Sequence, residues 1–202
     1  MSLLLDANYW NERYLKNDFG WDLGTISPPL KEYFDQIKNK NLSILIPGAG
    51  NSYEAEYLVN NGFANVYVCD LAEEALSNLK KRCPAIKLEN LLHGDFFELN
   101  SNKHSKPIVF DLIIEQTFFC AINPSLRSTY FKQMHKLLKP GGKLVGLLFD
   151  AVLNTDQPPF GGSKAEYPHY FEQLFDAQHF EKAYNSIKPR EGRELFINLI
   201  KK

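Results

Sequence analysis

Two glycines and an aspartate have the spacing of a nucleoside-binding turn. Gly48 and Gly50 close a short apolar run, and Asp70 ends a second apolar run 20 residues after Gly50. In nucleotide-binding sheets, glycines at the first turn let a ligand approach the backbone, and an acid at the end of the next strand accepts the ribose hydroxyls. The spacing predicts an adenosine site at these residues and the adjoining Leu71, although a tight turn and an ordinary strand end would look the same.

The residues after the glycines favour a ligand without phosphate. The dinucleotide fingerprint has a third glycine where this chain has Tyr53, and Glu54 follows it. A carboxylate in the first turn of a helix would repel a pyrophosphate bound there. S-adenosylmethionine carries no phosphate and is cationic at its sulfonium and amino groups. We therefore expect this cofactor, with S-adenosylhomocysteine as its product, rather than NAD.

Other acidic and aromatic residues suit the same ligand. Asp95 follows a weak third strand, where it can reach an adenine amino group, with Phe96 beside the ring. Trp10, Tyr14 and Trp21 lie in a segment outside the alternating core. They could cover a sulfonium, because cation–π attraction contributes about 2 kcal/mol once water is excluded. Taken singly, each of these aromatic residues is more often part of a core.

Apolar runs alternate with helical patterns along most of the chain. Strands are expected at residues 43–47, 66–70, 86–92, 109–114 and 143–149, with helices at 52–62, 72–82 and from 124 to the Lys-Pro-Gly-Gly stretch at 139–142. Such alternation indicates a mostly parallel, doubly wound α/β sheet. A helix is expected at 167–175. The runs at 178–185 and 194–200 have a connection too short for a parallel crossover, so an antiparallel edge hairpin is expected.

Composition predicts one domain and argues against several classes of protein. The 202 residues, 44% hydrophobic and 23% charged, suffice for one core, so residues 1–202 are expected to form a single domain with 1–30 as a lid. A net charge of −1 predicts neither nucleic acid nor anionic lipid as a partner. No membrane helix, signal peptide or metal-ligand spacing is found, which predicts a cytoplasmic protein with reduced cysteines and no metal.

Several blocks between Trp10 and Phe175 match a known family. They are Trp10 with Tyr14, GWDLG at 20–24, IPGAG at 46–50, GDFF at 94–97, FDLI at 110–113, FFCAINP at 118–124, LLKPGG at 137–142 and PPF at 158–160. The chain resembles the thiopurine S-methyltransferase superfamily, most closely its plant-type thiol and halide methyltransferases. FFCAINP with the downstream Arg127 is specific, whereas LKPGG is common to many methyltransferases.

The resemblance implies a Rossmann-like, seven-stranded class I methyltransferase fold. It also implies that the methyl donor is held by Trp10, Tyr14, Trp21, Gly48, Asp70, Asp95, Phe96 and Gln116. Gln116 is the residue expected two positions beyond the fourth strand. Family members often have Asp followed by Tyr or Arg where this chain has Glu115 and Gln116, and usually Cys in place of Ala49. The first departure lies near the transferring methyl group.

Methyl transfer from a sulfonium is an in-line displacement that needs alignment and exclusion of water more than a general base. A thiol with a pKa of about 8.5 is partly ionised at neutral pH, and halides are already anions, so a dry aromatic pocket is expected. Candidate acceptor residues are Phe118, Phe119 and Phe160, with Arg190 to attract an anionic acceptor. Glu115 could hold the amino group of the cofactor or accept a proton, and the sequence leaves both roles open.

The sequence thus predicts a monomeric methyltransferase acting on a small thiol, hydrosulfide, thiocyanate, halide or thiopurine. Two alternatives belong to other classes. A NAD-dependent oxidoreductase is disfavoured by the missing third glycine and by the lack of a catalytic Tyr, Lys or His constellation. A non-catalytic sensor of an adenosine ligand would keep the cofactor residues without turnover.

Overall fold

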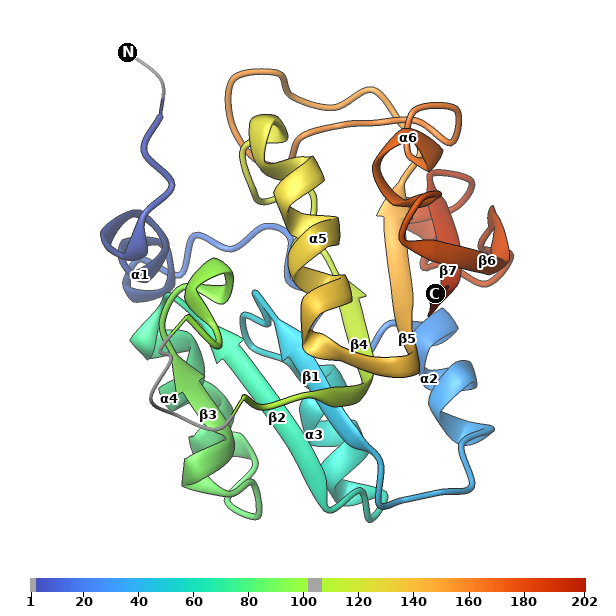
Figure 1. The fold of residues 1–202 in the computed structure, drawn as a ribbon. Helices are drawn as coiled ribbons and strands as arrows, with labels where there is room; N and C mark the ends of the chain where they lie inside the picture. The colour runs from blue at the N-terminus through green and yellow to red at the C-terminus, as the bar shows by residue number, and fades with distance from the viewer. Residues whose placement is uncertain (1–2, 102–106) are drawn as a thin grey trace.

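The computed structural model, which describes residues 3–101 and 107–202, contains a seven-stranded sheet with helices on both faces (Figure 1). The strands are β1 Ser43–Pro47, β2 Asn65–Asp70, β3 Leu91–His93, β4 Phe110–Gln116, β5 Leu138–Phe149, β6 Phe175–Lys182 and β7 Glu194–Lys201. The helices are α1 Ala7–Leu15, α2 Pro28–Asp35, α3 Tyr53–Asn60, α4 Glu73–Arg82, α5 Arg127–Leu137 and α6 Pro168–Phe171. Short 3-10 turns occur at η1 Leu88–Asn90, η2 Phe96–Glu98, η3 Pro124–Leu126 and η4 Lys188–Arg190.

The strand order is β3-β2-β1-β4-β5-β7-β6. The first five strands in this order are parallel, whereas β7 runs antiparallel to both β5 and β6. The predicted parallel sheet with an antiparallel C-terminal edge is therefore confirmed. The chain winds from β1 out to β3 and then crosses to β4, so the winding reverses between β1 and β4. In open parallel sheets, ligands bind beyond the carboxyl ends of the strands at such a reversal.

Successive side chains of a strand point to opposite faces of the sheet, and helices cover both faces, so side chains are buried on each side. Leu45 and Ile113 face one side, where they join the cluster formed with α5 and α6. Ile44 and Ile46 face the other side and join the cluster formed with α2, α3 and α4. Each such fully buried side chain contributes about 2 kcal/mol to stability. Among the helices of the described residues, none is long and apolar enough to cross a membrane.

Some predicted boundaries were wrong for local reasons. Strand β3 is shorter than the predicted 86–92, because η1 precedes it and the Asn90 side chain donates to Val66 O at 3.0 Å. Strand β5 begins at Leu138 rather than at 143, since a shift of register between Phe110 and Leu112 accommodates the Pro-Gly-Gly stretch. The predicted helix at 167–175 is reduced to α6, and Phe175 already opens β6.

The N-terminal segment packs against the first turn of α4. The side-chain oxygen of Asn11 accepts the N–H of Glu74 at 3.1 Å, which satisfies a free donor at the start of that helix. Tyr14 packs on Ala72 and Ala75, together with neighbouring aromatic residues of the segment. The first two residues of the predicted lid lie outside the described part of the chain. Helix α1 lies beside the ends of β2 and β3 (Figure 1), whereas the last residue of the predicted lid, Leu30, belongs to α2 and is buried in the core.

Candidate active site

A cavity of about 450 Å³ opens at the carboxyl ends of β1 to β4, where the winding of the sheet reverses. This volume is typical of a small-molecule site. The cavity wall brings together the predicted cofactor residues and one predicted acceptor residue: Trp10, Tyr14, Trp21, Gly48, Gly50, Asp70, Leu71, Asp95, Phe96, Gln116 and Phe118. Residues far apart in sequence, from the N-terminal segment to the loop after β4, therefore share one wall.

The first glycine turn is closed by aromatic side chains. Gly48 and Gly50 have φ angles of +55° and +54°, in the left-handed region that favours glycine. A Cβ atom on Gly48 would overlap the ring of Phe118, and one on Gly50 would lie 2.5 Å from the hydroxyl of Tyr14. Both glycines are thus required by backbone conformation and by close packing.

Asp70 has acceptor positions that its contacts within the protein leave free for a ligand. Its side chain is buried, and its two oxygens accept the N–H groups of Gly50 and Ala72, each at 2.8 Å. Burial raises the pKa of this carboxyl, whereas the two N–H groups act in the opposite direction. Each oxygen retains a further lone pair, so the pair of ribose hydroxyls could be accepted here.

Asp95 and Phe96 directly follow Gly94 after β3, and both line the cavity. Asp95 is exposed and caps η2, because its Oδ1 accepts the N–H of Phe97 at 2.8 Å. Phe96 is buried and meets the ring of Phe118 edge-on, with the ring centroids 5.3 Å apart. The carbonyl of Phe96 also accepts the Gln133 amide at 2.9 Å. The aromatic side chain is thereby fixed, while the neighbouring carboxylate stays open to solvent and ligand.

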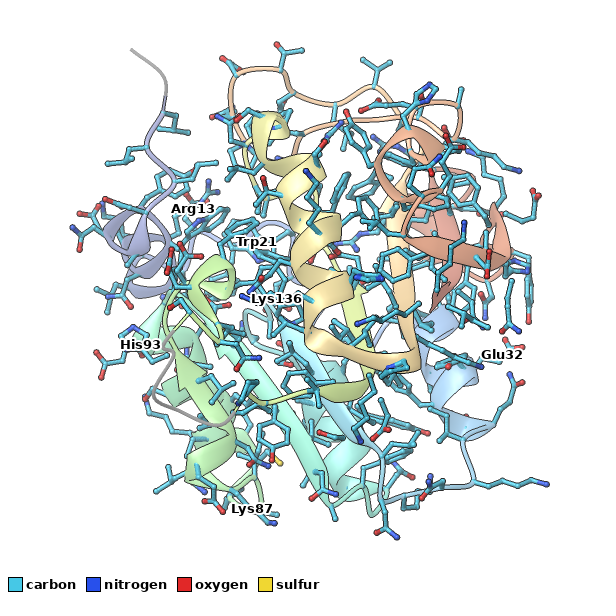
Figure 2. All side chains as sticks on the ribbon, viewed as in Figure 1. Arg13, Trp21, Glu32, Lys87, His93 and Lys136 are labelled. Carbon is cyan, nitrogen blue, oxygen red and sulfur yellow. The ribbon has the colours of Figure 1, made fainter. Side chains whose placement is uncertain are left out.

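The aromatic residues of the N-terminal segment form one group over the cavity. Trp21 meets Trp10 edge-on at 5.6 Å and Tyr14 edge-on at 6.0 Å between ring centroids. The guanidinium of Arg13, a residue of α1, lies 4.8 Å from the centroid of the Trp21 ring, and Trp21 lies between α1 and α5 in the view of Figure 2. The Trp21 ring is thus held by contacts within its own segment.

Glu115 lies behind the cavity wall and does not line it. It is fully buried, and its Oε1 accepts the N–H groups of Phe118 at 2.8 Å and Phe119 at 3.0 Å. Its Oε2 accepts the hydroxyl of Tyr130. Burial raises the pKa of Glu115 to about 7. All of these contacts hold the turn after β4, so the geometry assigns this carboxyl to positioning the wall.

Two of the predicted acceptor residues lie behind the wall as well. Phe119 and Phe160 are buried but do not line the cavity. Phe119 packs on Tyr130 at 4.9 Å between ring centroids, and the N–H of Phe160 donates to Cys120 O at 2.7 Å. Only Phe118 of the Phe-Phe pair reaches the cavity, because Phe119 is directed into the core cluster beneath the wall.

Arg190 is not brought to the cavity either. Its buried guanidinium pairs with Glu194 at 3.3 Å and donates to Trp21 O at 2.7 Å. The same group lies 5.5 Å from the centroid of the Phe149 ring. Arg190 thus ties the connection between β6 and β7 to the backbone of the N-terminal segment, instead of offering its charge to a ligand.

Sequence reasoning missed Ser52 and misplaced Gln116. Gln116 is the last residue of β4, not two positions beyond it, because the strand continues past the predicted end at 114. Ser52 lines the cavity with a φ of +48°. Ser52 Oγ and Gln116 Oε1 are buried and have no hydrogen-bond partner within the described chain. Unpaired buried oxygens are costly, and both of these belong to residues of the cavity wall.

Other missed wall residues come from the loop after β4 and from the Pro-Pro pair. They include Ile122, Asn123, Leu126, Pro158 and Pro159. Four of these five belong to the FFCAINP and PPF blocks, so the blocks themselves were the signal that could have found them. They give this end of the cavity a largely apolar wall.

Comparisons with known proteins agree on one family and one fold. The family described as thiopurine S-methyltransferase matches residues 5–199. A probable thiol methyltransferase 2 of Arabidopsis thaliana is 30% identical over 92% of this chain and 81% of its own. A thiocyanate methyltransferase 1 of Brassica oleracea is 28% identical over 86% and 76%. The structure of a Burkholderia thailandensis 1,6-didemethyltoxoflavin N1-methyltransferase with bound S-adenosylhomocysteine has a TM-score of 0.74 at 16% identity, covering 97% of this chain and 87% of its own.

Proposed function

The chain belongs to the thiopurine S-methyltransferase family, and we propose that it methylates a small apolar thiol with S-adenosylmethionine as donor. Small-molecule methylation with this cofactor is what the family and its relatives support, and it replaces the dinucleotide alternative. The sulfonium of the donor supplies an activated methyl group when it is bound.

The charge of the cavity carries the assignment of the donor. Asp22, Glu54, Asp70 and Asp95 line it, and the part of the wall that the structure describes has no lysine, arginine or histidine. A wall of this charge favours a cation and disfavours a diphosphate. We assign Asp70 to the ribose and Asp95 with Phe96 to the adenine. Trp10, Tyr14 and Trp21 would face the sulfonium through cation–π contacts.

The acceptor end favours a nucleophile that needs no base. The four carboxylates lie at the cofactor end, and Asp22, Glu54 and Asp70 already accept protein N–H groups. Ile122, Leu126 and the two prolines line the opposite end with apolar surface. A thiol ionises without assistance more readily than a phenol or an alcohol, and as a thiolate it attacks directly. A thiol can enter the cavity neutral and bury its organic group against this apolar surface, whereas thiocyanate and halides enter as anions that no cation of the described wall could pair with, so an organic thiol is favoured.

The wall residues then align the donor and the acceptor and exclude water from them. Phe118, held by Glu115 through the backbone, covers Gly48 and excludes water from the turn. The N-terminal segment, which we propose as a lid, closes the other side through Tyr14 and Trp21. Removal of water leaves a thiolate and a sulfonium less solvated, which accelerates a reaction in which opposite charges cancel.

A matched acceptor series tests the proposal. Benzenethiol, phenol and aniline share one ring and differ only in the nucleophilic atom, and thiocyanate and iodide serve as bare anions. Calorimetry with S-adenosylhomocysteine is run in parallel, so that donor binding is measured separately. We expect tight binding of S-adenosylhomocysteine, methylation of benzenethiol at least about tenfold faster than thiocyanate or iodide, and no methylation of phenol or aniline.

Each other outcome has a defined meaning. Failure to bind S-adenosylhomocysteine would overturn the whole assignment. Preferred methylation of phenol or aniline would overturn the sulfur acceptor. Faster methylation of thiocyanate or iodide than of benzenethiol would overturn the choice of an apolar thiol over an anion, and binding without any turnover would favour the sensor.

The same proposal includes a monomeric, cytoplasmic protein. One chain supplies every residue assigned above, which supports a site that works without a second copy. The three cysteines, all within the described residues, are free and buried, which supports a reducing compartment. Light scattering after size-exclusion chromatography tests the monomer: a mass near 23.2 kDa is expected, and twice that mass would contradict it.

A further inference from the structure

Three leucines expose apolar surface at the mouth of the cavity. Single exposed leucines are common on proteins and need no explanation. Of the large apolar side chains exposed among the described residues, however, Leu3, Leu4 and Leu126 also line the cavity. Leu3 and Leu4 precede α1, and Leu126 ends η3 at the start of α5. Both segments lie above the carboxyl ends of β1 to β4 in Figure 1, so we call these three side chains the rim.

The apolar wall continues from the interior of the cavity to the rim. Ile122 lines the cavity and is 7% exposed, whereas Leu126 is 38% exposed and Leu4 is 72% exposed. No lysine, arginine or histidine interrupts the part of this wall that the structure describes. An apolar group bound near Ile122 can thus extend outward over the rim and remain on apolar surface.

The exposure of Leu126 is fixed by the structure around it. The side-chain oxygen of Asn123 accepts the N–H and the hydroxyl of Ser125, at 3.0 and 2.8 Å. The N–H of Leu126 donates to Asn123 O at 2.9 Å. The next residue, Arg127, is buried and pairs with Glu166 at 2.6 Å. Turn η3 is therefore held on both sides, and Leu126 stays partly exposed on a fixed backbone.

We propose that the acceptor is a thiol whose apolar tail leaves the cavity over the rim and covers Leu4 and Leu126. A small thiol bound wholly inside would leave these side chains in water, whereas a tail lying on them removes apolar surface of both partners from water. The thiolate sulfur forms the new S–CH3 bond, the C–S bond of the sulfonium breaks with its electron pair going to the donor sulfur, and the thiol proton is released to solvent. This inference rests on the proposed function and narrows its acceptor to thiols with an extended tail.

A series of para-alkylbenzenethiols tests the tail. Benzenethiol and its para-methyl, para-ethyl and para-butyl derivatives differ in length, whereas the alkyl group is remote from the sulfur and leaves its nucleophilicity nearly constant. Burial of one methylene group strengthens binding by up to about fourfold. KM should therefore fall at least about tenfold from benzenethiol to para-butylbenzenethiol, while kcat changes by less than about twofold. We call the KM of benzenethiol divided by that of para-butylbenzenethiol the tail gain.

Substitutions on the rim test where the tail lies. Leu126→Ser and Leu4→Ser should each reduce the tail gain by at least about threefold, because serine removes apolar surface that the tail covers. Leu126 is the N-cap of α5, a position that favours serine, so this variant should fold. Leu88→Ser is the matched control, since Leu88 is 68% exposed but does not line the cavity. It should leave the tail gain unchanged.

Three results would overturn the inference while leaving methylation of thiols intact. One is a KM that stays constant or rises with tail length although every thiol of the series is methylated. Another is a tail gain that neither rim variant reduces. The third is a wild type of twice the monomer mass in light scattering that Leu126→Ser converts to monomers, which would show that a second copy of the chain covers the rim. Failure of the wild type to methylate any of these thiols would instead overturn the proposed function, and this inference with it.

Discussion

Replacement of Glu115 by glutamine tests how the cavity wall is held. The Oε1 atom of Glu115 accepts the N–H groups of Phe118 and Phe119, at 2.8 and 3.0 Å. A glutamine has the same shape, and its amide oxygen can keep both of these bonds. Its amide N–H can then donate to the oxygen of Tyr130, which at present donates to Glu115. We therefore expect the turn after β4 to survive in Glu115→Gln.

The stability of the two proteins should differ in its dependence on pH. Burial raises the pKa of Glu115 from 4.5 to about 7. Between these values the folded protein holds a proton that the unfolded chain has released, so the free energy of unfolding falls as pH rises through this window and is then constant. Each tenfold difference in proton affinity corresponds to about 1.4 kcal/mol, so the wild type should lose about 3 kcal/mol from this group. Glu115→Gln should not show this loss.

Urea unfolding of both proteins at pH 4.5, 6, 7 and 8 measures the difference. Other titrating groups cancel when the two curves are subtracted, so the stability of Glu115→Gln relative to the wild type should rise by about 3 kcal/mol across the series. If the free energies of unfolding of the two proteins changed in parallel with pH, the assignment of a buried, protonated carboxyl to Glu115 would be refuted. Methylation of benzenethiol should fall by less than about fivefold, because Glu115 does not line the cavity. A folded variant without activity would show that Glu115 acts as a base.

Three further predictions concern the wall and its anchors. Gly48→Ala should abolish detectable binding of S-adenosylhomocysteine in calorimetry, because the added Cβ overlaps Phe118 at a φ of +55°; binding within about twofold of the wild type would contradict the close packing. Arg190→Met should lower the free energy of unfolding by about 3 kcal/mol by leaving Glu194 buried and unpaired, whereas Arg190→Lys should lose less; equal losses would show that the charge is irrelevant. Asp70→Asn should weaken the binding of S-adenosylhomocysteine about tenfold in calorimetry, since the asparagine amide has one acceptor oxygen where the carboxylate has two. Unchanged affinity would remove Asp70 from the ribose site.

The parts of the site that sequence reasoning could place are local to one βαβ unit. Gly50 and Asp70 are 20 residues apart in the unit formed by β1, α3 and β2. The fold of this unit lets the N–H of Gly50 donate to the Asp70 carboxylate. The period of the apolar residues was sufficient for this unit, because each strand is buried on both faces. The antiparallel edge followed in the same way from a connection too short for a crossover.

The direction of a single side chain after a strand could not be predicted in this way. Phe118 and Phe119 are neighbours of identical chemistry, yet only the first lines the cavity. Their directions depend on the turn that Glu115 and Tyr130 hold, and Tyr130 comes from a helix 15 residues further along the chain. No residue pattern reports such a contact. The positive φ of Ser52 could not be predicted from the residue pattern either.

Contacts between distant segments were also beyond the sequence. The sequence places Arg190 in a short connection and predicts that it attracts an anionic acceptor. It is 169 residues away from Trp21, whose carbonyl its guanidinium meets at 2.7 Å. A buried arginine is retained where its charge is paired and its N–H groups are used, and Glu194 with Trp21 meets both conditions. The consequence for function is indirect, because Arg190 fixes the backbone that carries an aromatic wall residue.

The proposed thiol acceptor requires that the cavity leave its own cysteines unmodified. Cys69 and Cys120 both line it, and burial raises the pKa of each thiol to about 12. Only the thiolate attacks, and at pH 7 such a thiol is ionised to about one part in 10⁵, against a few per cent for a free thiol with a pKa of about 8.5. The nearby carboxylates of Asp70 and Asp95 add to the raised pKa of Cys69. The acidic wall that favours a cationic donor therefore adds to the burial that keeps the Cys69 thiol protonated.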